Sequence, residues 1–398
     1  MDRNKSIALL DKKRCFSCRS CVQVCPKHAI EMKANEEGFF YPVVGDVCIN
    51  CGLCVQHCPA LSPTKNTEPF SRISYVARLK DTNLLMRSTS GGVFAGIAEK
   101  VIDDGGCVVG AAYDKDLFVN QEVVSDKEGL EKLKGSKYVE SCTADSFLKV
   151  KKILDGQKTV LYSGTPCQIE GLKKFLGKEY PNLYTIDLIC HGVPSQKLFH
   201  KYLEWLSLKL GEKIIAYNFR DKSCGGWLCG FGKTKTKTKT KKIIGGRDPY
   251  YASFLRCELY RESCYSCPFS SMDRPGDLTI GDFFEVIKFY PKVDRKKGIS
   301  LCVVNSEKGL RLFNVVKQQF ELLPIKEEQY LPEKGNLHSP SPRPAVRSRI
   351  YKEIDLSSKE YFSRFKETKL YFHLYRCVLD MIPVSLKKFI KCKMKRNI

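Results

Sequence analysis

The pattern of apolar and polar residues predicts short strands near the start of the chain and larger helices and strands after residue 70. Gly38 to Val44 (GFFYPVV) and Ile73 to Leu79 have strand character. The apolar positions of Val93 to Asp104 recur at helical spacing, and two glycines end that helix. Cys107 to Tyr113 (CVVGAAY) is apolar along most of its length, which is typical of a buried strand.

Two strand, turn and helix units come next and indicate an α/β core. Thr159 to Tyr162 is followed by a turn with Gly and Pro and by the helical segment Gln168 to Leu176. Leu183 to Ile189 leads in the same way into Gln196 to Leu210. Ligands in such cores bind at the carboxyl ends of the strands. We therefore expect both turns to lie at a ligand-binding edge.

The first 66 residues contain one cysteine motif twice. The motif is C-x2-C-x2-C-x3-C-P, and its two copies are Cys15, Cys18, Cys21, Cys25, Pro26 and Cys48, Cys51, Cys54, Cys58, Pro59. In two-cluster ferredoxins the fourth cysteine of each run binds the other 4Fe-4S cluster. The predicted ligand sets are Cys15, Cys18, Cys21 and Cys58 for cluster one, and Cys48, Cys51, Cys54 and Cys25 for cluster two. Zinc is the alternative, but zinc sites use cysteine pairs rather than two identical runs closed by proline.

This module should depend on its metal. So few apolar residues cannot offset the entropy of ordering the loops, and we expect folding and cluster insertion to be coupled. The whole chain has 398 residues and 43% hydrophobic content, which leaves room for one or two larger globular units. The segment before Cys15 lacks the apolar core of a signal peptide, so we expect a cytoplasmic protein whose 20 cysteines are reduced.

The net charge of +23 is concentrated in two places. Lys233 to Lys242 (KTKTKTKTKK) fits either a solvated edge strand or hairpin, or a solubilising loop, and we favour the loop. Pro383 to Ile398 is either a solvated helix or a basic amphipathic helix that contacts an anionic membrane. We expect no nucleic-acid partner, because no aromatic platform, helix-turn-helix or zinc finger accompanies these charges. A slight excess of Lys and Arg in the module suits docking of an acidic ferredoxin.

Further candidate residues lie in turns of the larger part. Cys264 and Cys267 form a C-x2-C pair, and with Cys190 they are either ligands of a third cluster or buried thiols. The Ser- and Gly-rich turn before Val93 is either a helix cap or a place where backbone N–H groups bind phosphate. His191 is either a proton donor or flavin contact, or a structural hydrogen-bonding residue.

Six motifs together resemble the coenzyme F420 hydrogenase/dehydrogenase beta-subunit family. They are Ser90 to Gly92 (SGG), Gly135 to Tyr138 (GSKY), Gly164 to Gln168 (GTPCQ), Asp187 to Pro194 (DLICHGVP), Arg261 to Cys267 (RESCYSC) and Thr279 to Phe283 (TIGDF). The resemblance implies an α+β protein with a ferredoxin-like two-cluster module at residues 1–66. It implies an N-terminal-type region at 70–155 and a flavin-binding region with a mixed sheet at 156–330, before a proline-rich arm and basic tail at 331–398.

The resemblance also implies an activity. It indicates an oxidoreductase that moves electrons between the clusters, a flavin (FAD) and a two-electron partner, which is coenzyme F420 or a ferredoxin-linked organic substrate. We expect the reacting edge at Cys190, His191 and Asp282. The alternatives are a non-catalytic electron-relay subunit of a hydrogenase or dehydrogenase, and a ferredoxin-dependent reductase in surface-glycan synthesis. The implied flavin contacts are Ser90, Gly91, Gly92, Lys137, Gly164, Thr165, Pro166 and Gln168.

Overall fold

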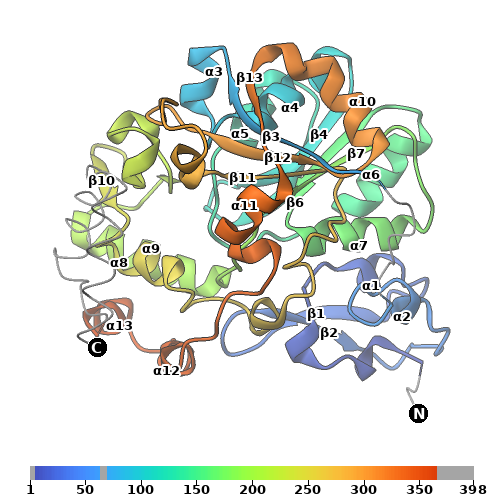
Figure 1. Cartoon of the computed structure of the whole chain (residues 1–398). Helices are drawn as coiled ribbons and strands as arrows, with labels where there is room; N and C mark the ends of the chain where they lie inside the picture. The colour runs from blue at the N-terminus through green and yellow to red at the C-terminus, as the bar shows by residue number, and fades with distance from the viewer. Residues whose placement is uncertain (1–4, 63–69, 365–398) are drawn as a thin grey trace, which may run out of the picture.

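The core of the protein is a mixed sheet of eight strands (Figure 1). The computed structural model describes residues 5–62 and 70–364, and the strand order is β13-β3-β12-β11-β7-β6-β4-β5. Strands β11, β7, β6 and β4 are parallel, and the remaining pairs are antiparallel. The strands are β3 (Ile73–Leu79), β4 (Cys107–Tyr113), β5 (Val119–Val124), β6 (Val160–Gly164), β7 (Leu183–Leu188), β11 (Leu278–Asp282), β12 (Ser300–Val304) and β13 (Phe320–Pro324).

Helices cover both faces of this sheet, which explains why its central strands are almost continuously apolar. Successive side chains of a strand point to opposite faces. Val108 and Leu161 accordingly pack against α4, α5 and α10, whereas Val109 and Tyr162 pack against α6 and α7. The predicted mixed α/β sheet is therefore confirmed. The helices are α3 (Thr82–Arg87), α4 (Val93–Asp103), α5 (Lys127–Leu133), α6 (Ser146–Asp155), α7 (Pro166–Leu176) and α10 (Glu307–Val316).

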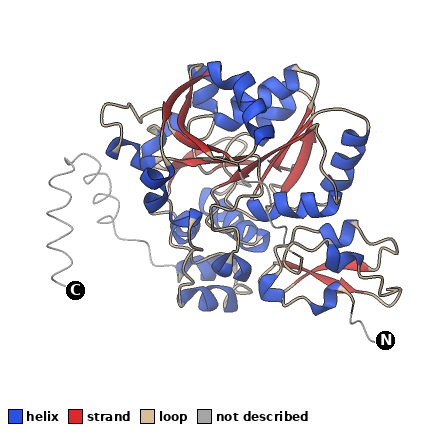
Figure 2. Ribbon diagram, turned by 45° about the vertical axis from the view of Figure 1, so that its right-hand side comes forward, coloured by secondary structure: helices blue, strands red, loops and turns tan. Residues whose placement is uncertain are grey.

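The N-terminal module contains an antiparallel hairpin and two single-turn helices. The hairpin joins β1 (Ile30–Ala34) to β2 (Phe40–Val44), and the helices are α1 (Ser20–Gln23) and α2 (Leu53–Gln56). Each helix begins after a residue with a left-handed backbone and carries the third cysteine of its run. The repeated sequence motif is thus a repeated local structure. The module lies beneath the sheet, with α1 against α6 and α7 (Figures 1 and 2).

A lobe beside the module has an aromatic core and includes the Lys-Thr run. Strand β9 (Phe231–Lys235) pairs antiparallel with β10 (Thr240–Ile244), and β8 (Ala216–Asn218) pairs with β9. Thr234 and Thr236 are buried, whereas Lys235 and Lys237 are exposed. The prediction of a solubilising loop was wrong, because the alternating threonines give the segment a buried face. The other elements of the lobe are α8 (Gln196–Leu210), α9 (Pro249–Leu255), α12 (Val346–Lys352) and α13 (Ser358–Ser363).

The remaining C-terminal elements follow the sheet. Helix α11 (Glu327–Tyr330) precedes the proline-rich arm, and the chain then descends from the sheet toward α12 in Figure 1. The basic segment Pro383 to Ile398 lies outside the described residues. Within residues 5–62 and 70–364, no helix has the length and apolar character required to cross a bilayer.

Arg261 forms a buried connection between the module and the body. Its side chain is 1% exposed, and it donates hydrogen bonds of 2.7 Å to the carbonyl oxygens of Cys15 and Phe40. It also lies 3.1 Å from the carboxylate of Glu140. Burial raises the pKa of Glu140, and the guanidinium opposes that shift. One side chain from the body therefore satisfies two carbonyls of the module.

We predict that Arg261→Met lowers the free energy of unfolding by about 3 kcal/mol, because it leaves a buried carboxylate without its partner. Urea denaturation under anaerobic conditions measures this change. Arg261→Lys should recover part of the loss. The control is Arg87→Met, which removes an ion pair whose arginine is 57% exposed and should change stability by less than about 1 kcal/mol. Equal effects of Arg261→Met and Arg87→Met would contradict the role of Arg261.

Candidate functional site

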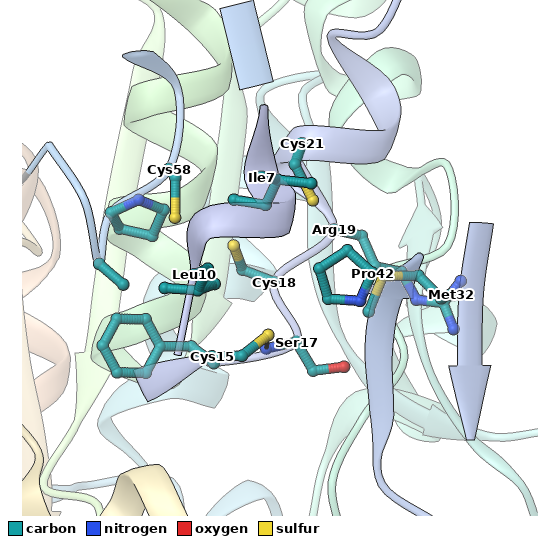
Figure 3. Close-up of a pocket in the computed structure, with 13 residues that line it drawn as sticks. Ile7, Leu10, Cys15, Ser17, Cys18, Arg19, Cys21, Met32, Pro42 and Cys58 are labelled. Atoms are coloured by element: carbon teal, nitrogen blue, oxygen red, sulfur yellow. Dashed lines mark hydrogen bonds between the residues drawn. The ribbon is translucent and has the colours of Figure 1, made fainter. Parts of the chain in front are cut away.

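Each cysteine set that we predicted for a cluster lines a cavity of its own. One cavity, with about 320 Å³ of empty space, is lined by Cys15, Cys18, Cys21 and Cys58, and Figure 3 shows this group of side chains. The second, with about 360 Å³, is lined by Cys25, Cys48, Cys51 and Cys54. Among the residues that the structure describes, no three His, Cys, Asp or Glu side chains form a group that could hold a single metal ion. The fourth cysteine of each run lines the cavity of the other run, which is the arrangement that paired 4Fe-4S clusters require.

The protonation of these thiols is coupled to cluster binding. Burial and the neighbouring thiol of Cys21 raise the pKa of Cys18, and burial with Cys15 raises the pKa of Cys21. Without a cluster these sulfur atoms are therefore protonated at neutral pH. Because clusters bind thiolates, binding must release protons. Backbone N–H groups of Ile7 and Ala29 already point at the sulfur atoms of Cys54 and Cys25, at 3.2 and 3.3 Å.

The two cavities differ in their position. All four cysteines of the first are buried, whereas Cys51 in the second is exposed. Helix α7 packs against Cys18 at Gly171, where an added Cβ would lie 2.7 Å from Cys18 Cβ and 3.0 Å from its sulfur. Thr143 Oγ1 donates to the carbonyl oxygen of Cys18 at 2.9 Å. Cys18 of the first cavity thus lies against the body, whereas Cys51 of the second is exposed.

Four further thiols meet on the body beside the module. Cys190 follows β7, and Cys264 and Cys267 lie at the short helix Glu262–Ser266. Burial raises the pKa of Cys264, and the nearby sulfur atoms of Cys190, Cys267 and Cys167 raise it further. The structure therefore brings together the three cysteines that we singled out for a third cluster. It adds Cys167, in the first turn of α7, four residues before Gly171.

A buried polar group surrounds Asp282 at the carboxyl ends of β7 and β11. Arg220 and Trp227 each donate a hydrogen bond of 3.0 Å to its carboxylate. Burial, the largest single effect, favours the protonated acid, but Arg220 together with hydrogen bonds from Trp227 and Ser90 outweighs it and lowers the pKa of Asp282. His191 is exposed to solvent, but partial desolvation lowers its pKa, Lys334 adds to this shift, and Asp282 opposes it. His191 and Asp282, two of the residues expected at the reacting edge, are therefore electrostatic neighbours.

Two lysines near this edge donate to backbone carbonyls. Lys222 is 6% exposed, and its ammonium lies 2.7 Å from the Leu85 oxygen and 2.6 Å from the Ser90 oxygen. Burial lowers its pKa to about 7. The ammonium of Lys137 donates to three carbonyls at the end of α5, and burial also lowers its pKa to about 7. Both groups would gain from a nearby anion, which would favour their charged form.

The other predicted flavin contacts fall into two groups at the same edge of the sheet. Gly91 packs closely on the sheet, since an added Cβ would lie 2.1 Å from the Ala77 oxygen. Gln168 accepts from the Thr165 N–H at 3.1 Å and donates to Ser141, so its amide is already engaged in capping α7. Strands β11 and β7 separate the groups, which corresponds to roughly 14 Å for three strand spacings. The first group is Ser90, Gly91 and Gly92 at β12, and the second is Gly164, Thr165, Pro166 and Gln168 at β6.

Sequence reasoning missed Arg220, Lys222 and Trp227. They lie in a short segment after β8 that carries none of the six motifs, and they reach the site only because this segment returns to the sheet. No periodicity or spacing in the sequence marks them.

Two cysteine-lined cavities in a small module on an α/β domain define an iron–sulfur electron-transfer protein. Residues 14–61 match the 4Fe-4S dicluster domain family, and residues 157–328 match the family described as the C terminus of the coenzyme F420 hydrogenase/dehydrogenase beta subunit. Two separate parts of the chain are thus similar to a 4Fe-4S dicluster domain and to the C-terminal part of F420 hydrogenase/dehydrogenase beta subunits. The resemblance seen in the sequence motifs is confirmed.

Individual relatives match parts of the chain. It is 27% identical over 223 residues to the coenzyme F420-dependent sulfite reductase of Methanocaldococcus jannaschii, covering 54% of this chain and 33% of that protein. It is 23% identical over 204 residues to an uncharacterized protein of the same organism, covering 44% and 57%. It therefore spans about a third and just over half of these relatives. A chain of the F420-reducing NiFe hydrogenase complex from Methanosarcina barkeri superposes with a TM-score of 0.45 and 16% identity, covering 75% of this chain and 94% of that one.

We predict that Gly171→Val displaces Cys18 and disrupts the cysteine set of the first cavity, because the new side chain would overlap Cys18. Iron content should fall by about four atoms per chain, the content of one cluster, as measured by metal analysis and electron paramagnetic resonance. Gly335→Val is the control, since an added Cβ there meets nothing within 4 Å. Full iron content in Gly171→Val would contradict the tight contact.

Proposed function

We propose that this protein is an iron–sulfur flavoenzyme that transfers electrons between a protein carrier and a two-electron partner of the coenzyme F420 type. The proposal is carried by the order of three groups of sulfur atoms. They are the cysteines of the second cavity, those of the first cavity, and the four thiols beside β7. The choice of a two-electron partner of the F420 type is based on the relatives. One is named an F420-dependent enzyme, and the matched family is named for F420 hydrogenases and dehydrogenases.

In this proposal the eight module cysteines bind two 4Fe-4S clusters, and Cys167, Cys190, Cys264 and Cys267 bind a third. Helix α7 supports the sequence of sites. Gly171 contacts Cys18 of cluster one, and Cys167 lies one turn earlier on the same helix, roughly 6 Å along its axis. Electrons that leave cluster one therefore meet the third group directly.

A flavin between the clusters and the partner would exchange single electrons on one side and electron pairs on the other. Lys222 and Lys137 fit its anionic part, since neither ammonium hydrogen-bonds to a carboxylate in the described structure. The two groups of small and capping residues at β12 and β6 suit an extended dinucleotide lying across the edge. Because Gly91 packs closely on the sheet, the space beside its Cα is already filled. The turn would therefore contact the cofactor through the backbone groups that face away from the sheet.

The group around Asp282 would form the reacting edge. The pKa of Asp282 is lowered beside Arg220, so it stays ionised, and the pKa of His191, which is exposed to solvent, is lowered by partial desolvation and by Lys334, which favours the neutral imidazole. A neutral imidazole can accept or donate a proton at the partner while the carboxylate fixes the positions of Arg220 and Trp227. Cys190, immediately before His191, would belong to the third cluster rather than to proton transfer.

The third cluster predicts about twelve iron atoms per chain purified without oxygen. Cys267→Ala should reduce this number to about eight, because one thiolate is lost from a four-cysteine set. Cys107→Ala, which changes a buried cysteine of β4 outside the set, should retain about twelve. A count of about eight in the unmodified protein would remove the third cluster.

Lys222→Met should weaken flavin retention about tenfold, because the loss of a charge-assisted hydrogen bond costs that much. The measurement is the flavin released on denaturation, together with bleaching by reduced F420. The matched control is Lys134→Met, since Lys134 is equally buried but already pairs with Glu99 and Glu131. Clusters without flavin in the unmodified protein would favour an electron-relay subunit instead.

A further inference from the structure

The exposed cysteine of the module, Cys51, belongs to its second cavity. Two cysteines of the first cavity are held against the body: Arg261 and Thr143 donate to the carbonyls of Cys15 and Cys18, and α7 packs against Cys18 at Gly171. In addition, Arg347 forms an ion pair with Glu37 on the hairpin loop. The second cavity includes the exposed Cys51. A protein carrier can therefore approach the second cavity directly at Cys51.

Two prominent apolar side chains flank Cys48, a cysteine of the second cavity. Ile49, which lines that cavity, is 58% exposed, and Val47, the residue before Cys48, is 65% exposed. Burial of such side chains in a protein interface is favourable, and exposed apolar groups that cluster on one surface indicate binding. Their position beside a proposed cluster ligand places this surface where short-range electron transfer requires contact.

The charges at the same cavity are basic. Lys5 and Lys27 line it and are exposed, and no acidic residue belongs to its lining. Neither lysine forms an ion pair within the described part of the chain. Asp46, which precedes Val47, already interacts within the protein. A docking partner with an acidic rim and an apolar centre is complementary to this surface.

We propose that Val47, Ile49, Lys5 and Lys27 form the docking surface for an acidic one-electron carrier protein of the ferredoxin type. This inference rests on the proposed function only in requiring a redox-active cluster in the second cavity. On docking, the reduced carrier loses one electron and the outer cluster gains it, and no bond is formed or broken. The lysines steer the encounter, and the two apolar side chains hold the complex.

The test uses the full-length protein and an acidic two-cluster ferredoxin, reduced and freed of excess reductant. Stopped-flow bleaching of the clusters gives the second-order rate. Val47→Asp/Ile49→Asp should lower it about tenfold or more, through loss of apolar contact and repulsion of the acidic carrier. Lys5→Glu/Lys27→Glu should lower it and weaken its dependence on salt. Reduction by methyl viologen, which needs no docking surface, should be unchanged in both.

A matched control separates the surface from general effects of new charges. Val315 is 60% exposed and Ile215 is 55% exposed, and both lie away from the module. Val315→Asp/Ile215→Asp should leave both rates unchanged. An unchanged ferredoxin rate in the two surface variants would overturn the proposal. Equal slowing with ferredoxin and methyl viologen in both would also overturn it, since the damage would then lie in the cluster. Because only cluster bleaching is followed, a missing flavin or a failure to react with F420 does not affect the outcome.

Discussion

The contact between the cysteines of the first cavity and the body of the protein is the constraint on which the rest of the structure depends. Gly171 leaves no space between α7 and Cys18. Arg261 has its donors distributed over two module carbonyls and a buried carboxylate. Buried polar groups that lose their partners are costly. These contacts therefore fix the position of the module relative to the body, and they hold Cys18 of the first cavity against α7.

This fixed position makes the two cysteine sets of the module different in their surroundings. The inner sulfur atoms are buried against the sheet domain, and the outer set includes an exposed cysteine. The same helix that packs against Cys18 carries Cys167 at its first turn. One element thus both contacts a cysteine of the first cavity and supplies a thiol to the next group.

Much of this arrangement could be predicted from the sequence, for physical reasons that particular residues illustrate. Cluster ligand sets follow from spacing alone, because two identical four-cysteine runs leave few ways to surround two clusters. Strands such as β4 (CVVGAAY) are apolar along most of their length and could be recognised without partners. The Lys-Thr hairpin was missed because only its packing against the aromatic lobe buries Thr234 and Thr236. Arg220 and Lys222 were missed for a related reason, since long-range folding places a motif-free segment at the sheet edge.

The turn after β7 lies between the proposed third cluster, which would transfer electrons, and the proposed reacting edge, which would transfer protons. Cys190 and His191 are consecutive, yet they have different neighbours. Cys190 lies with Cys267 and the other thiols, while His191 lies with Asp282 and Lys334. Successive side chains in extended backbone point in opposite directions. β7 lies beside β11, which ends at Asp282, and beside β6, which leads into Cys167. A single residue step at this position therefore separates the proposed third cluster from the proposed reacting edge.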